Sequence, residues 1–380
     1  TAVGKDSMKT NTTGTNNGAF GTRTLQLNTT GSSNVAVGDL ALGANTTGGA
    51  NVAVGSGALD ANTTASNNTG VGFNALTANT TGASNTSVGK SSSRSNTTGT
   101  QNSAFGFFAY ASGTTGGQNV AVGFAALDAN TTASDNTAVG ASALTANTTG
   151  NQNTFVGALS GAALTEGPAN TALGFESLTA DTKGQNSVAI GHHALSTQNF
   201  TSATNTYNVA VGSQAGLSVT TGIQNTLIGG LAGDAMTTGD NNTFIGMSAG
   251  GTGVTTGSSN TSIGTAALQS VTSGASNCAM GQDAGGSLTT GSNNLLLGHD
   301  TGLTGSPGGA QTTASNVIFL GDENITNIYA AVSSIGTSDA RDKTDFTALD
   351  LGLDFVKALA PVTYKWDKRS KYGDKTADGY

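Results

Sequence analysis

The chain has 380 residues, of which 57 are glycine, 9% are charged and 5% are aromatic, so it holds too few large apolar side chains for an ordinary globular core. The net charge is −8, and only six basic residues occur in the first 337. Because binding to phosphates needs clustered lysine and arginine, we do not expect nucleic acid as a partner. No apolar run approaches the roughly 18 residues of a membrane span, so we expect no membrane insertion.

A short phrase, V-A-V-G or a variant of it, recurs along most of the chain. Its closing glycine, here called the anchor glycine, occurs nineteen times between Gly4 and Gly321, mostly at steps of 17 residues. Longer steps of 21, 18 and 23 residues precede Gly212, Gly264 and Gly321. This period predicts a solenoid in which each repeat is one coil that buries its apolar face only against its neighbours.

Each repeat is expected to contain one short strand. Apolar and small residues alternate before the anchor, as in Val35, Ala36 and Val37, which is the period of a strand with one buried face. Asparagine four residues before the anchor, as at Asn34, is expected to hydrogen-bond along the stack and to tolerate a left-handed corner. The anchor glycine allows a positive φ at the next corner.

After the anchor, Ala-Leu pairs such as Ala41 and Leu42 predict a second inward-facing segment, and A-N-T-T-G predicts a turn. The predicted fold is therefore all-β: a parallel β-solenoid or β-roll of 17-residue repeats that forms a shaft over residues 1–321. At a strand spacing of ~4.8 Å, the shaft would be roughly 85 Å long.

No cofactor or metal is expected. Cys278, the only cysteine, is interpreted as a small core residue. His299 and the pair His192 and His193 follow anchor glycines, where side chains should point outward, and they form no H-x-H pattern typical of a metal site.

The same outward positions are the predicted receptor contacts. We expect His192 and His193 to contribute, together with an aromatic group that departs from the repeat and could stack on sugar rings: Phe107, Phe108 and Tyr110. Packing between chains is the alternative role of this aromatic group.

The composition changes after residue 337, where the last 43 residues carry eight basic and eight acidic side chains. We expect a β-rich neck over 322–337 and a small α/β segment over 338–380. In that segment, an apolar stripe over 349–359 predicts a helix that ends before Pro361, and V-T-Y-K-W predicts a strand.

Two families resemble parts of the chain. N-S-V-A-I-G at 186–191 resembles the repeat in the head domains of trimeric autotransporter adhesins, whose shorter repeats form a left-handed β-roll of three chains. The C-terminal S-D-A-R-D-K followed by L-A-P-V-T-Y-K-W resembles the intramolecular chaperone of phage tail fibres and tailspikes, the endosialidase type.

The second resemblance implies a segment that aligns three chains and then cuts itself off. It assigns Ser338 and Lys343 to a catalytic dyad and places the cleaved bond between Thr337 and Ser338. Residues 338–380 are shorter than such domains, so we expect only their N-terminal part. No motif of an enzyme with an external substrate occurs.

The leading hypothesis is a homotrimeric fibre of a phage virion, extracellular, that attaches to a glycan or protein on the host cell surface. The alternatives are a trimeric adhesin or filament on a bacterial cell surface, and a spacer without receptor contact.

Overall fold

The structure is a computed structural model and describes residues 1–251 and 253–327. Within these ranges every regular element is a β-strand. The strands are β1 (Ala2–Val3), β2 (Gly18–Phe20), β3 (Val35–Val37), β4 (Val52–Val54), β5 (Thr69–Val71), β6 (Thr86–Val88), β7 (Ser103–Phe105), β8 (Val120–Val122), β9 (Thr137–Val139), β10 (Thr154–Val156), β11 (Thr171–Leu173), β12 (Gly184–Gln185), β13 (Val188–Ile190), β14 (Thr204–Asn205), β15 (Val209–Val211), β16 (Thr226–Ile228), β17 (Thr243–Ile245), β18 (Thr261–Ile263), β19 (Cys278–Met280), β20 (Leu295–Leu297) and β21 (Ile318–Leu320).

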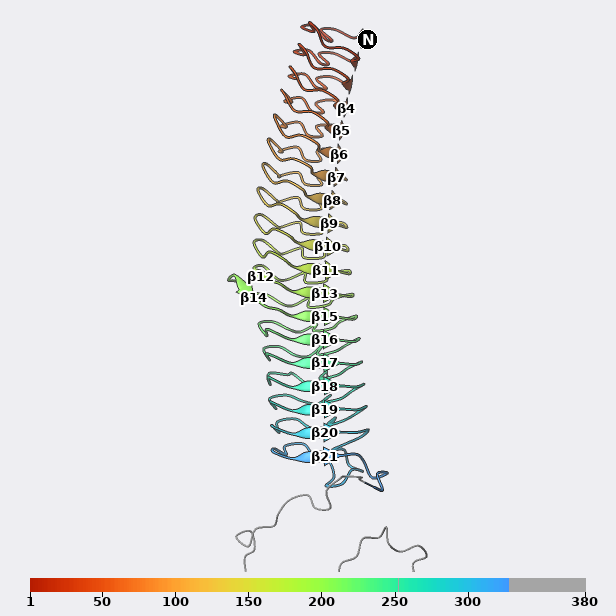
Figure 1. Ribbon diagram of the computed structural model, residues 1–380, viewed down its shortest axis with the longest axis vertical. Coiled ribbons are helices and arrows are strands. Elements are labelled where there is room, and N and C mark those ends of the chain that lie inside the picture. Colours follow the sequence, from red (N-terminus) through yellow and green to blue (C-terminus); the bar gives the residue numbers. More distant parts are fainter. Residues whose placement is uncertain (252, 328–380) are drawn as a thin grey trace, which may run out of the picture. The chain divides into compact units, whose positions relative to one another are not determined.

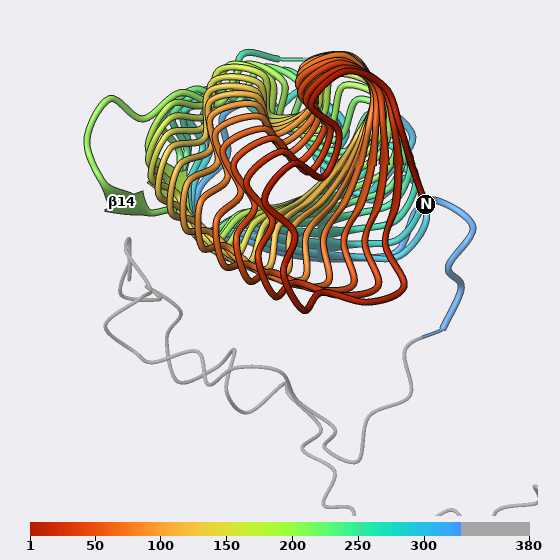
Figure 2. The ribbon, with the colours of Figure 1, turned by 90° about the horizontal axis from the view of Figure 1, so that it is seen from above.

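Nineteen of these strands form one parallel sheet with one strand from each coil. Each strand pairs in register with the equivalent residues of the next coil, as Ala36 with Ala53. Figure 1 shows the strands stacked along one side of the shaft, and Figure 2 shows the coils superimposed when seen along it. The predicted all-β parallel solenoid of 17-residue coils is confirmed.

The buried central position of most strands carries a small residue, whereas β10, β16, β17 and β20 carry Phe155, Leu227, Phe244 and Leu296 there. Ala36 is inaccessible, whereas Val35 and Val37 on either side of it are 43% and 38% exposed. Ala41 and Leu42 pack inward, so the predicted inward segment after the anchor is confirmed, although it forms turns and not a strand. In coils with this pattern the core is therefore a narrow layer of alanine against leucine, and the valines of the strand face outward.

The corners require unusual backbone angles. Gly72 has φ +139°, and a Cβ on it would lie 2.4 Å from the carbonyl oxygen of Gly89 in the next coil. Close stacking and a positive φ together restrict this position to glycine, as the sequence predicts. The left-handed corner predicted at asparagine is wrong by one residue: the residue before it, such as Ser33 with φ +60°, adopts it.

The asparagines before the strands form the predicted ladder. Asn34 donates through Nδ2 to the side-chain oxygen of Asn17 at 3.2 Å and to the carbonyl oxygen of Gly48 at 2.9 Å. The Asn17 side-chain oxygen also accepts the backbone N–H of Asn34 at 2.9 Å. Each buried amide thus satisfies backbone groups of its own coil and the next.

A second ladder lies in the A-N-T-T-G segments, which the sequence analysis treats only as turns. Asn45 donates to the side-chain oxygen of Asn28 at 2.7 Å, and Asn62 to that of Asn45 at 2.8 Å. The threonine that follows donates its hydroxyl to the next coil, as Thr46 does to the carbonyl oxygen of Thr63 at 3.0 Å. These asparagines are fully buried, so their side-chain amides are satisfied within the ladder.

The 21-residue step before Gly212 produces a protrusion. β12 and β14 pair outside the main sheet and extend from the shaft in Figures 1 and 2. Beneath them, the buried Asp181 accepts hydrogen bonds from the backbone N–H groups of Gly184 and Phe200, both at 3.0 Å, and from Gln198 Nε2 at 2.6 Å. These bonds fix the base of the protrusion.

Residues 1–326 pack as one compact unit. The predicted neck and α/β segment, including the expected helix over 349–359, lie outside the described residues except for the neck's first residues, so the domain boundaries stay predictions. Among the described residues there is no helix that could span a membrane.

The prediction that Cys278 is a core residue is wrong. It is only half-buried because it occupies an outward position of β19, beside Leu295 of β20.

Candidate functional site

The predicted catalytic residues Ser338 and Lys343, and the predicted cleavage position after Thr337, lie outside the described residues. Among the described residues, the candidate functional site is the surface of the shaft.

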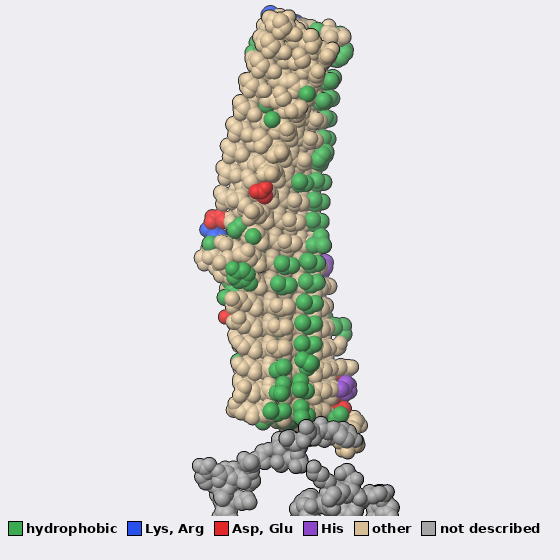
Figure 3. Space-filling view, viewed as in Figure 1, with side chains coloured by type: hydrophobic (Ala, Val, Ile, Leu, Met, Phe, Trp, Pro, Cys, Tyr) green, Lys and Arg blue, Asp and Glu red, His purple; other side chains and the backbone are tan. Residues whose placement is uncertain are grey.

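The first surface is a line of apolar side chains on the outer face of the sheet, here called the outer stripe. Its members are the residues directly before the anchor glycines, and none of them is buried. They are Val3, Phe20, Val37, Val54, Val71, Val88, Phe105, Val122, Val139, Val156, Leu173, Ile190, Val211, Ile228, Ile245, Ile263, Met280, Leu297 and Leu320. Figure 3 shows hydrophobic side chains forming a band along one face of the shaft. A continuous apolar patch of this length is typical of a protein–protein interface.

The second surface is an aromatic group with two cations, here called the aromatic–cation cluster: Lys90, Arg94, Phe107, Phe108 and Phe124. The Phe107 ring lies 4.1 Å from that of Phe108 and stacks on that of Phe124 at 5.7 Å, with an angle of 11° between the planes. Lys90 Nζ lies 5.5 Å from the centre of the Phe107 ring, and the Arg94 guanidinium lies 4.9 Å from that of Phe108. These distances are those of cation–π contacts.

The prediction that Tyr110 contacts a receptor is wrong, because its side chain is inaccessible. It occupies the inward leucine position of its coil, and its hydroxyl donates to the carbonyl oxygen of Gly116 at 3.0 Å. Burial raises the pKa of Tyr110 to about 12, against a smaller lowering by the hydrogen bond from Asn119. Tyr110 is therefore part of the core.

The two histidines form a separate group. His192 is exposed and stacks on Phe175 at 5.7 Å, and the half-buried His193 lies 3.3 Å from a carboxylate oxygen of Glu176 through Nδ1. Five coils separate Phe107 from His192, a distance of roughly 24 Å at the usual strand spacing. The structure therefore does not bring the predicted receptor contacts together in one site.

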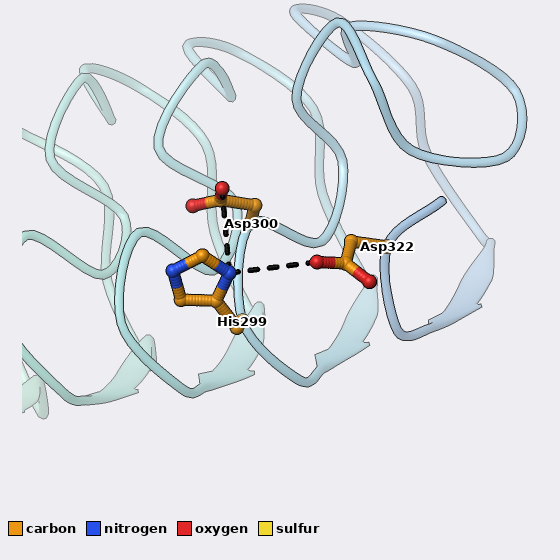
Figure 4. A group of neighbouring side chains, drawn as sticks. All are labelled: His299, Asp300 and Asp322. Atoms are coloured by element: carbon orange, nitrogen blue, oxygen red, sulfur yellow. Dashed lines mark hydrogen bonds and ion pairs between the residues drawn. The ribbon is translucent and has the colours of Figure 1, made fainter. Parts of the chain in front are cut away.

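A third group lies at the C-terminal end of the described shaft (Figure 4). His299 Nδ1 is 3.3 Å from Asp300 Oδ2 and 3.5 Å from Asp322 Oδ2. Hydrogen bonds from the side chain and backbone N–H of Asn324 lower the pKa of Asp322, with a smaller contribution from His299. The His299 side chain is therefore held between two carboxylates, one from its own coil and one from the next.

Lys90, Arg94, Phe124 and Phe175 were not predicted from the sequence. The signal was present: Lys90, Phe107 and Phe124 each follow an anchor glycine in consecutive repeats, and Phe175 follows one further along. Lys90, Phe124 and Phe175 therefore share one position of the repeat with Phe107, whereas Arg94 lies five residues after its anchor glycine.

Comparison with known families concerns the end of the chain. Residues 338–378 match the family model described as chaperone of endosialidase. This segment is similar to the chaperone of endosialidase. The resemblance stated from S-D-A-R-D-K and the residues after it is confirmed for the segment. No curated protein matches the chain.

Proposed function

We propose that this chain forms the shaft of a trimeric phage tail fibre, an extracellular part of the virion that attaches to a glycan or protein on the host cell surface. The match of residues 338–378 to the chaperone of endosialidase carries this proposal. The stacked shaft supports it, because coils that template one another build a long, stiff spacer between a particle and a cell.

Three copies would associate through the outer stripe. Exposed strand residues from Val3 to Leu320 offer the same apolar surface on every coil, and cyclic assembly of identical chains covers such a surface on all of them. The stripe follows a shaft roughly 85 Å long, so three chains could bury it along their whole length.

The C-terminal segment would align the chains and then release itself by cutting between Thr337 and Ser338. A lysine whose pKa is lowered by burial or by neighbouring cations can accept the proton of a serine hydroxyl without a histidine. Lys343 would act in this way on Ser338, and no external substrate is involved.

The test is the intact mass of the full-length gene product beside its Ser338→Ala and Lys343→Ala variants, with Lys357→Ala as a matched control. We expect a fragment ending at Thr337 from the wild type and the control, and uncut chains from the other two variants. An uncut wild type would contradict self-cleavage, and a monomeric shaft under native conditions would contradict the fibre.

A trimeric adhesin or filament on a bacterial cell surface is the second candidate. The strand phrase N-S-V-A-I-G, found on β13, favours it. Detection of the protein in purified phage particles would support the fibre, whereas its detection in the envelope of uninfected cells would support the adhesin.

A further inference from the structure

Five of the lysine and arginine side chains of the shaft make one of two kinds of contact. Lys9, Arg23 and Lys183 each lie within 3.1 to 3.2 Å of a carboxylate oxygen. Lys90 and Arg94 make no such ion pair with any described residue and instead approach the rings of Phe107 and Phe108. Two positive charges in an acidic chain are thus placed beside exposed rings and remain available to an anion.

The rings extend along the shaft. Phe73, Lys90, Phe107 and Phe124 occupy the position after the anchor on four successive coils, and the three rings are 52%, 36% and 57% exposed. At about 4.8 Å between coils, this column spans roughly 14 Å. It can therefore contact several units of a linear polymer and not only a single small molecule.

The backbone strain at Phe108 carries no functional information. Its φ of +57° is left-handed, which is uncommon for an aromatic residue. The equivalent residue has a similar angle in other coils, for example Ser91 and Ala125. What distinguishes this part of the shaft is the side chains.

Nearby acidic charge is limited. Asp128 is a carboxyl group in electrostatic contact with Arg94, and its pKa is raised by burial and lowered to a smaller extent by Arg94. Asp128 is half-buried, whereas the Lys90 and Arg94 side chains are exposed. An arriving carboxylate would therefore meet the cations first, and a guanidinium can bind a carboxylate through two parallel hydrogen bonds.

We propose that the aromatic–cation cluster binds a linear polysaccharide that carries carboxylate groups. Sugar rings lie against the exposed surface of the stacked Phe107–Phe124 pair, and the carboxylates pair with Lys90 and Arg94. This inference rests on the proposed function, because it names the ligand class of a receptor contact on the fibre.

The test is affinity electrophoresis of the whole chain in gels that contain alginate, a polymer of uronic acids, or neutral dextran. We expect alginate to retard the wild type and dextran to leave its mobility unchanged. Replacing both rings, by Phe107→Ala and Phe124→Ala, should weaken alginate binding at least tenfold. Replacing Lys90 or Arg94 by alanine should weaken it several-fold and reduce its dependence on salt.

Phe175→Ala and Lys183→Ala are the matched controls, since they remove an exposed ring and a cation elsewhere on the shaft. Both should bind alginate as the wild type does. Absence of retardation, or equal loss in the controls, would overturn the inference. So would a double-ring variant that loses its oligomeric state but still binds alginate, because the cluster would then be a contact between chains.

Alginate binding tests the cluster, whereas self-cleavage and trimer size test the proposed fibre. Self-cleavage and trimer size do not depend on the cluster, so they should be unchanged in the Phe107→Ala, Phe124→Ala variant. A monomeric, uncut wild type that still binds alginate would support the polysaccharide-binding site and contradict the proposed trimeric fibre.

Discussion

At the scale of single residues, the coil of Tyr110 shows how the repeat accommodates a bulky side chain. Gly113 stands where earlier coils have a ladder asparagine, and a Cβ there would lie 2.2 Å from Cζ of Tyr110. The Tyr110 hydroxyl donates to Gly116 at 3.0 Å, the equivalent of the bond from Asn96 to Gly99 at 3.1 Å. The phenol thus replaces one rung of the ladder.

We predict that the Tyr110→Phe variant loses the alkaline sensitivity of this coil. The folded pKa of Tyr110 is raised to about 12, above the unfolded value of about 10, so its stabilisation is full below pH 10 and is lost as pH rises toward 12. At pH 8 the variant should be less stable by about 1 kcal/mol, because one hydrogen bond is lost. Urea unfolding between pH 8 and 11.5 should show the two stability curves converging and then crossing as the wild type loses its advantage, and parallel curves would contradict this.

The second prediction concerns residues whose backbone is in the left-handed conformation. Ala50 has φ +57° and is exposed, and this conformation is unfavourable for any residue with a Cβ. Ala50→Gly should therefore stabilise the protein by about 1 kcal/mol. Ala53→Gly, in the buried centre of β4, should destabilise it by a similar amount. The urea midpoints of both variants test this, and a destabilised Ala50→Gly would refute it.

At the scale of elements, the coils are held by buried amides as well as by apolar contacts. Asn51 accepts the backbone N–H of Asn68 at 3.0 Å and donates to the carbonyl oxygen of Ala65 at 2.9 Å. It also donates to Asn34 at 3.1 Å. With alanine on the strand, these hydrogen bonds supply specificity of register that the small core cannot supply alone.

We predict that Asn51→Ala destabilises the shaft by about 1–3 kcal/mol, because it leaves the buried N–H of Asn68 unpaired and removes one of the two hydrogen bonds that the carbonyl of Ala65 accepts. Asn67→Gly, at an exposed left-handed position, is the control and should be neutral or slightly stabilising. Hydrogen exchange of the peptide that contains Asn68 should be faster only in Asn51→Ala. Unchanged exchange would mean that the amide ladder does not hold the coils together.

The sequence predicts the coils and their register because the anchor glycines and asparagines recur at fixed spacing. It does not predict which strand face is inside, because Val-Ala-Val alternates in either direction, and only the packed coil shows that Ala36 is buried while Val35 and Val37 are exposed. The second ladder was missed for a similar reason: N-T-T-G also has the composition of a solvent-exposed turn.

At the scale of the whole molecule, the shaft has buried amides beside its apolar core and a further line of apolar residues on its outer face. The sequence shows Phe107, Phe108 and Tyr110 as departures from the repeat. It does not show that Tyr110 is buried, because the inward position of this coil is only two residues after Phe108. Ser338 and Lys343 stay predictions from resemblance. The outer stripe is the feature that the proposed trimer depends on most.

The most direct measurement is disulfide crosslinking of single cysteines on the shaft. In a Cys278→Ala background, Val211→Cys places a thiol in the outer stripe, and Thr149→Cys places one on an exposed turn. If three chains pack through the stripe, mild oxidation should link Val211→Cys chains into covalent dimers and leave Thr149→Cys chains unlinked. Equal linking of both variants, or none at position 211, would contradict assembly through this face.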